Sequence, residues 1–270
     1  MFRRVLAFLL TSFALTLALG NAQTTAGLNA PQLYEKGMNA LVGSRVTQSG
    51  VDAMEYFRRS ADLGYAPAQV VLGYFYETGT FTPKEPAQAL SLYKKAAQQD
   101  DPLAQWLAGR MVYAGTLSPR DLNEAVALLQ TAADHGNPFG QYLLGKIKLE
   151  RQDYSQSAQW LRKAAEQGLP QAQQQLAILL RDGQGVPRDK FEAYVWMILS
   201  QEAGNRAVAA DLQALEADLG SNQTEQAKSK AREMETSVTR TVNARGCTGW
   251  PGEFAAIPTS PPPDLQKFCR

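Results

Sequence analysis

One six-residue phrase recurs four times in this chain, and the repetition constrains the fold more than any other feature. The copies occupy residues 64–69, 100–105, 136–141 and 168–173, and each ends in a glutamine that follows a proline. The four glutamines are 36, 36 and 32 residues apart. A period in this range indicates a stack of supersecondary units, each of which buries its apolar face against its neighbours. The repetition therefore predicts a solenoid before any residue is considered for chemistry.

Each repeat unit is predicted to contain two helices. The proline of the phrase suits the first turn of the first helix, where an amide N–H has no partner within the helix. Counted at 100° per residue, the buried face of the first unit centres on Leu72 and includes Ala68, Phe75, Tyr76 and Gly79. The second helix ends in two small residues that allow close packing before a Gly or Asp ends the helix: Ser60-Ala61, Ala96-Ala97, Ala132-Ala133 and Ala164-Ala165.

These residues resemble the Sel1-like repeat, a relative of the tetratricopeptide repeat. The pattern A-x-x-x-L-G-x-x-Y-x-x-G, followed by a loop and A-x-x-x-x-x-K-A-A, occurs in the first full unit at Ala68, Leu72, Gly73, Tyr76, Gly79, Ala89, Lys95, Ala96 and Ala97. The last unit carries the loop typical of the family over residues 183–189, whereas the loop of the third unit, residues 150–153, is four residues shorter. A degenerate unit precedes the four good ones, and the resemblance covers about residues 31–236.

The resemblance implies an all-α, right-handed αα-repeat solenoid of about five units over residues 31–204. Two further helices over residues 205–239 are expected to cap the stack, because the end of a solenoid needs a polar outer face. Residues 240–270 are rich in proline and form a predicted tail. We expect this tail either to cap the last helices or to occlude the concave groove.

The first residues have the composition of a secretory signal. A basic pair, Arg3 and Arg4, precedes an apolar run over residues 5–19, and small residues at 20 and 22 predict cleavage after Ala22. Residues 1–22 are therefore expected to be a signal peptide, and residues 23–30 a linker. The protein is expected to be exported, periplasmic or secreted, with no membrane span once the signal is cleaved.

The two cysteines fit an oxidising compartment. Cys247 and Cys269 both lie in the tail, and a disulfide between them would close a loop worth roughly 3 kcal/mol. Two unpaired thiols remain the alternative. Without residues 1–22, 25 basic and 26 acidic residues remain, a net charge of −1, so nothing in the charge balance points to nucleic acid.

Catalytic and metal-binding groups are scarce in the sequence. The single histidine, His135, falls at the end of a second helix, where a cap is expected, and one His with two paired Cys cannot form a metal site. Ser91 and Lys94 match the S-x-x-K spacing of penicillin-interacting enzymes, but the supporting S-D-N and K-T-G elements are absent. We therefore expect no enzyme activity, no cofactor and no metal.

The face opposite the apolar stripe has an unusual composition. In tetratricopeptide-like stacks the first helices line the concave surface, and aromatic and arginine residues dominate binding hot spots. The alternative is that these side chains pack against a neighbouring unit, and for Trp106 the sequence favours binding and packing equally. The predicted partner-binding residues of the concave face are Trp106, Tyr142, Tyr74, Arg110, Lys146 and Tyr113.

The resemblance implies an exported adaptor or regulator that binds an envelope protein or peptide segment in its concave groove. A binding module for cell-wall or exported polysaccharide is the alternative, because Tyr and Trp rings also suit sugar rings. A hydrolase acting on cell wall or β-lactam is a distant alternative. Some exported relatives linked to β-lactam binding carry cysteine-bridged repeats, and no repeat of this chain contains a cysteine.

Overall fold

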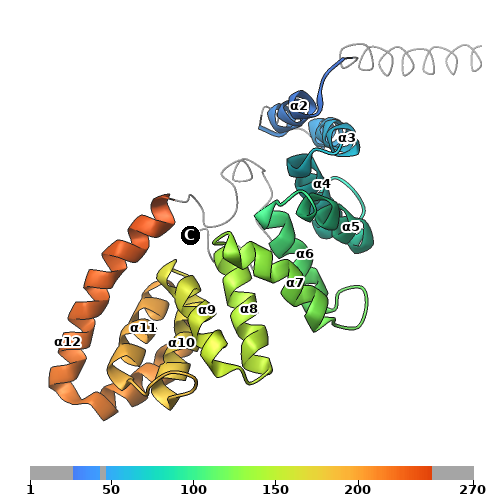
Figure 1. The fold of residues 1–270 in the computed structure, drawn as a ribbon. Coiled ribbons are helices and arrows are strands. Elements are labelled where there is room, and N and C mark those ends of the chain that lie inside the picture. The colour runs from blue at the N-terminus through green and yellow to red at the C-terminus, as the bar shows by residue number, and fades with distance from the viewer. Residues whose placement is uncertain (1–26, 43–46, 245–270) are drawn as a thin grey trace, which may run out of the picture.

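The computed structural model describes residues 27–42 and 47–244, and within these ranges it contains helices, turns and loops but no strand. Figure 1 shows the helices stacked in chain order along a curved path. The signal segment, residues 245–270 of the predicted tail and the cysteine pair fall outside the described residues, whereas residues 240–244 of the predicted tail are helical. The α-helices are α2 (Ala30–Val42), α3 (Thr47–Asp62), α4 (Ala66–Thr78), α5 (Pro86–Ala97), α6 (Pro102–Ala114), α7 (Leu122–Asp134), α8 (Pro138–Glu150), α9 (Tyr154–Glu166), α10 (Pro170–Asp182), α11 (Lys190–Glu202) and α12 (Ala209–Ala244).

The helices from α2 to α11 form five pairs, and each helix packs on the next one in the chain. This arrangement confirms the prediction of an all-helical repeat stack. The recurring phrase spans the turn between pairs, and its proline occupies the first turn of α4, α6, α8 and α10. The repeat period therefore corresponds to one helical hairpin per unit.

Polar side chains and glycines set the ends of these helices. The Asp101 carboxylate accepts a hydrogen bond from the N–H of Ala104 (2.8 Å) and caps α6, and Asn137 caps α8 in the same way. At the other end, Gly115 follows α6 with φ 66°, a left-handed conformation that costs glycine little. In the third unit, Gln152 takes up a positive φ instead, in the short turn between α8 and α9.

A row of glycines lets the two helices of each unit approach closely. A Cβ atom added at Gly73 would lie 2.7 Å from the Tyr93 ring, and one added at Gly109 would lie 2.7 Å from Leu129 Cγ. Gly37 faces Phe57 and Gly145 faces Leu161 in the same way. In the last unit Ala177 and Met197 occupy these two positions, both fully buried. The unbranched Met side chain can make room for the extra methyl group.

The first helix of a unit is buried on more sides than the sequence stripe predicts. Every residue from Ala68 to Tyr76 is buried in α4, and so is every residue from Leu103 to Gly109 in α6. The reason is that α6 packs against α5, α7 and α8 together. A stripe calculated from one helix shows only the densest of these contacts.

The glutamine of the phrase is a buried hydrogen-bonding residue. The side-chain amides of Gln69, Gln105, Gln141 and Gln173 each donate to the carbonyl eight residues earlier, at Ala61, Ala97, Ala133 and Ala165, over 3.1–3.4 Å. These carbonyls lie at the ends of the preceding second helices, where backbone acceptors lack partners within the helix. The glutamines, called the glutamine ladder below, thus link each unit to the one before it.

The C-terminal elements close the last unit. A short 3₁₀ turn (Arg206–Val208) leads into α12, which has two helical segments that meet at Gly220, where φ is 74° and ψ is 169°. Ion pairs connect Asp211 to Arg181 of α10 and Asp218 to Lys190 of α11. Helix α12 ends at Ala244, a few residues beyond the capping helices predicted from the sequence. Within the described residues, no helix combines the length and apolarity that crossing a membrane requires.

Candidate functional site

The predicted binding residues gather where α6 and α8 contact each other. Helix α6 contributes Trp106, Arg110 and Tyr113, which are spaced four and three residues apart and share one helical face. Helix α8 contributes Tyr142 and Lys146, together with a residue that the sequence argument missed. We call these six residues the α6–α8 ridge: Trp106, Arg110, Tyr113, Phe139, Tyr142 and Lys146.

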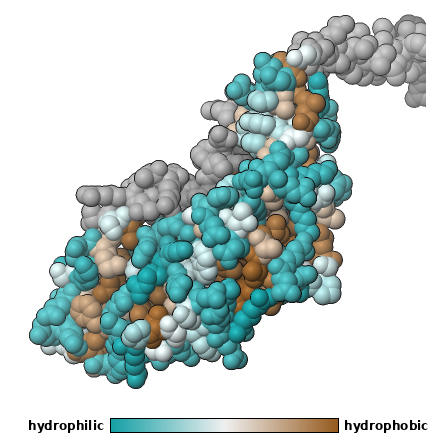
Figure 2. Space-filling view, viewed as in Figure 1, coloured by the Kyte–Doolittle hydropathy of each residue, from teal (hydrophilic) through white to brown (hydrophobic). Residues whose placement is uncertain are grey.

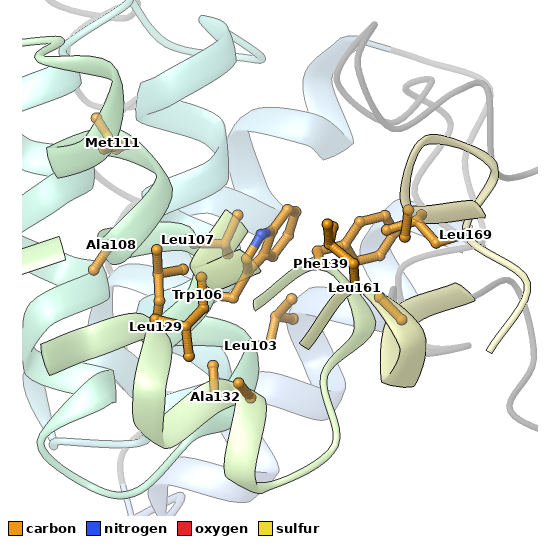
Figure 3. Close-up of a cluster of buried hydrophobic side chains, with 14 of the residues drawn as sticks. Leu103, Trp106, Leu107, Ala108, Met111, Leu129, Ala132, Phe139, Leu161 and Leu169 are labelled. Atoms are coloured by element: carbon orange, nitrogen blue, oxygen red, sulfur yellow. The ribbon is translucent and has the colours of Figure 1, made fainter. Parts of the chain in front are cut away.

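Trp106 lies at one end of the ridge and is 2% exposed. Its ring faces Phe139 with the centroids 4.9 Å apart, and Figure 3 shows Leu103 and Leu107 beside it. Among the residues that the structure describes, the buried indole N–H finds no hydrogen-bond acceptor. Tyr74, also predicted to bind a partner, is 1% exposed on α4. Neither ring offers open surface. Both pack against neighbouring helices, which is the alternative that the sequence left open for Trp106.

Arg110 connects the ridge to the preceding unit. Its guanidinium pairs with Glu77 of α4 and lies 5.7 Å from the centroid of the Trp106 ring. Glu77 also accepts a hydrogen bond from the Tyr93 hydroxyl (2.9 Å), so one carboxylate joins α4, α5 and α6. Burial and the nearby Glu77 carboxylate raise the pKa of Tyr93, which keeps its hydroxyl protonated as the donor. Arg110 is therefore held in place by its neighbours.

Lys146 is the cation of the ridge that has no carboxylate partner in the described part of the chain. Its ammonium lies 5.6 Å from the centroid of the Tyr113 ring and 5.8 Å from that of Tyr142, distances at which a cation is attracted to a ring face. The residue is half-buried. A cation held by two rings keeps its ion-pairing capacity for another group.

The two tyrosines beside Lys146 are hydrogen-bond donors at neutral pH. Burial and the hydrogen bond to Glu150 raise the pKa of Tyr113, whose hydroxyl donates to that carboxylate (2.5 Å). Burial also raises the pKa of Tyr142. Arg120 pairs with Glu150 and lies 4.2 Å from the centroid of the Tyr113 ring. The outer end of the ridge is thus rich in oriented polar groups.

Phe139, Glu77 and Glu150 were missing from the predicted site. Phe139 is part of the recurring phrase, where it was taken as a structural position. Glu77 falls in the same helical column as Tyr113, but a single carboxylate does not show from the sequence that it pairs with an arginine 33 residues later. The sequence did offer one signal for Glu77, because it is an acidic residue in a set of aligned positions that also holds aromatic and basic residues.

The groups considered for catalysis do not converge in the described residues. His135 is the exposed cap residue of α7, as predicted from its position. Ser91 is exposed on α5, and the nearby Lys94 pairs with Glu124 of α7. No group of three or more His, Cys, Asp or Glu side chains is placed to hold a metal ion in the part of the chain described.

The chain belongs to the Sel1 repeat family. Five consecutive Sel1 repeats match residues 32–65, 66–101, 102–137, 138–169 and 170–205, which is more than half of the chain. The last four of the five matched segments begin within the recurring phrase. Sel1 repeats form scaffolds for protein–protein interaction, and the fold and the resemblance read from the sequence agree with this membership.

Two solved structures share the fold. A protective antigen of uropathogenic Escherichia coli with an SLR fold superposes with a TM-score of 0.69 at 27% identity over 89% of this chain. The chain spans about half of that antigen, 51% of its length. A Sel1 repeat protein from Oxalobacter formigenes superposes with a TM-score of 0.62 at 25% identity, over 76% of this chain and 88% of the other. None of the curated proteins is a significant match to the sequence.

Proposed function

We propose that this protein is an exported adaptor or regulator, without catalytic activity, that holds a segment of a partner protein on the α6–α8 ridge. The observation that carries the proposal is Lys146, a half-buried cation with no carboxylate partner among the described residues, set between the Tyr113 and Tyr142 rings. An ammonium held between two rings can still form a charge-assisted hydrogen bond with an incoming carboxylate. The fold supplies the rigid support, because the ridge residues stand on packed helices and not on loops.

The chemistry of the ridge favours a peptide that carries an acidic residue next to an apolar one. A carboxylate would pair with the Lys146 ammonium and accept from the Tyr142 hydroxyl, while an apolar neighbour would lie against Tyr113. Charge-assisted hydrogen bonds of this kind are stronger than neutral ones. The partner is thus proposed by its chemistry, an acidic and partly apolar envelope protein segment.

The buried rings favour a protein partner over a polysaccharide. A sugar ring needs an open aromatic face, and Trp106 and Tyr74 offer almost none at 2% and 1% exposure. Trp106→Ala would therefore test core packing more than binding, since removal of a buried tryptophan costs about 3–5 kcal/mol of stability.

The sharper test is Lys146→Gln, which removes the charge and leaves a polar side chain that is one atom shorter. The matched control is Lys148→Gln, because Lys148 lies on the same helix, is also half-buried and is in none of the ridge contacts. A partner is first captured from envelope extract with the wild-type protein, identified, and then titrated by calorimetry against each variant. Lys146→Gln should weaken binding by about 5–30-fold, or about 1–2 kcal/mol, with Lys148→Gln unchanged.

Other outcomes would count against the proposal. Equal affinities for both variants would show that the partner binds elsewhere. Retention on purified peptidoglycan that is unaffected by Lys146→Gln would favour the polysaccharide alternative. Export is tested separately by sequencing the N-terminus of the mature protein, which should begin at Gln23.

A further inference from the structure

We propose that a cleft between α11 and α12 binds a polyamine, a flexible chain of methylene groups that carries an ammonium at each end. The cleft has a volume of about 460 Å³, which lies within the range of small-ligand sites. Side chains of α11 and of both segments of α12, residues 209–219 and 221–244, line it. The cleft shares no residue with the α6–α8 ridge, so this inference is independent of the proposed function.

Tyr194 of α11 presents an unpaired hydroxyl group to the cleft. The side chain is 3% exposed, and within the described residues its hydroxyl forms no hydrogen bond but keeps accessible surface. Burial and the Glu216 carboxylate raise the pKa of Tyr194, so the hydroxyl is protonated at neutral pH. A polar group that is this buried normally has a partner. A molecule in the cleft can supply that partner, because the hydroxyl oxygen can accept a hydrogen bond from an ammonium N–H.

The Tyr194 end of the cleft has more carboxylates than cations. The Lys228 ammonium lies 3.6 Å from the Glu216 carboxylate and 3.0 Å from that of Glu225, so one lysine serves two acidic side chains. Both carboxylates also act electrostatically on the Tyr194 hydroxyl, and Lys228 opposes them. One negative charge therefore remains uncompensated among these groups, and an ammonium beside Tyr194 would be attracted to it.

Glu202 gives the other end of the cleft the same character. It follows Tyr194 by eight residues on α11, which places the two about 12 Å apart along the helix axis. Burial and the Glu235 carboxylate raise the pKa of Glu202, whereas Arg232 favours its charged form. Two carboxylates and one guanidinium thus gather at this end. A second ammonium would relieve the repulsion between Glu202 and Glu235.

The middle of the cleft is apolar. Ile198 lies between Tyr194 and Glu202, four residues from each, so the three side chains share one face of α11. Leu212 of α12 also lines the cleft and is buried. Figure 2 shows hydrophobic side chains between hydrophilic ones at the end of the molecule where Figure 1 places α11 and α12. Methylene groups therefore match the middle of the cleft, and ammonium groups match its ends.

The length of the cleft selects among ligands. An extended chain of single bonds advances about 3.3–3.6 Å for every three bonds, so the nine bonds between the terminal nitrogens of spermidine span about 10–11 Å. This length is close to the separation of Tyr194 and Glu202 along α11. A divalent metal ion needs acidic side chains that converge on one point, and the described residues contain no such group of three or more. A sugar ring would need an open aromatic face, which the buried Tyr194 ring does not offer.

The experiment titrates spermidine into the full mature chain by isothermal calorimetry at about 150 mM NaCl, which screens attraction between exposed charges. The first variant is Glu202→Gln, which removes the charge at one end of the cleft. The second is Tyr194→Phe, which removes only the hydroxyl group. The matched control is Glu233→Gln, because Glu233 is likewise exposed but does not line the cleft.

One equivalent of spermidine should bind the wild-type chain and raise its Tm. The affinity should fall about tenfold in Glu202→Gln and about threefold to fivefold in Tyr194→Phe, because each variant loses a hydrogen bond to an ammonium. Glu233→Gln should stay within about twofold of the wild type. Putrescine has five bonds between its nitrogens and spans only about 6 Å, so it reaches one end alone and should bind at least about tenfold more weakly.

Three results would overturn the inference. Absence of saturable spermidine binding would show that the cleft holds no polycation. Equal losses in Glu202→Gln and Glu233→Gln would assign the binding to acidic surface in general. Equal affinities for putrescine and spermidine would show that the two ends of the cleft do not act together. None of these outcomes involves Lys146, so the proposed function is tested separately by its own titration.

Discussion

The glutamine ladder has two gaps, and filling one of them should stabilise the protein. In the first full unit the Gln69 side-chain oxygen accepts from the Gln99 amide (2.9 Å), and in the third the Gln141 oxygen accepts from Gln167 (2.6 Å). The corresponding oxygens of Gln105 and Gln173 have no donor within the described part of the chain. The reason is visible in the repeat: the positions of Gln99 and Gln167 are occupied by His135 and Ala203 in the second and fourth units.

The perturbation is His135→Gln, which places an amide donor at the position where two other units already have one. Gln105 is 4% exposed, so its unpaired oxygen bears a desolvation cost of about 1–3 kcal/mol. A new hydrogen bond contributes about 0.5–1.5 kcal/mol net. The entropy lost on ordering the new glutamine side chain offsets part of the free energy gained by pairing the Gln105 oxygen. We therefore expect a gain of about 0.5–1.5 kcal/mol, or about 1–6 °C in Tm for a chain of this size.

The assay is thermal and urea unfolding of the variant and the wild type in the same buffer. The control is His135→Ala, which removes the imidazole without adding a donor. The reasoning predicts a gain for His135→Gln alone. If His135→Ala gives the same gain, or if His135→Gln gives none, the ladder oxygen is not a stability defect and the repeat comparison is wrong.

The remaining predictions concern close contacts between helices. Gly109→Ala should lower the free energy of unfolding by about 1–3 kcal/mol, because the new methyl group meets Leu129 Cγ at 2.7 Å. Adding Leu129→Met to the same chain should recover part of the loss. Both effects are measured by urea unfolding. Full stability of Gly109→Ala would contradict the packing. Glu77→Gln should cost about 1–2 kcal/mol, because Arg110 loses a partly buried ion pair, and equal stability at low and high salt would argue against that cause.

Much of the fold could be predicted because the recurring phrase marks where the repeat units begin. The proline of the phrase starts four first helices, and Gly73 of the family pattern lies where the two helices of its unit meet closely. These features depend on local chemistry, namely a missing N–H and a missing Cβ, so a sequence shows them directly. Four of the five matched repeats begin within the phrase.

The candidate site was harder to predict because it depends on which helices surround a residue. Tyr74 and Trp106 are opposite the apolar stripe, which suggested a surface, but both are buried. Helical periodicity reports the contacts of one helix with one neighbour, whereas α6 has three neighbours. The ladder glutamines were likewise recognised only as period markers. An uncharged polar residue that recurs inside an apolar helix was the signal for a buried hydrogen bond.

The comparison among units separates packing positions from functional ones within a single chain. The ladder position is Gln in four units, and the close-contact position is Gly or Ala in all five, because the same helix contact is built each time. The Trp106 position is instead Val70, Tyr142 and Gln174 elsewhere. A side chain that stacking itself requires would recur at the same position of each unit. Among the described units, this combination of ridge side chains occurs where α6 meets α8, and it is the basis on which we propose a ligand at that place along the solenoid.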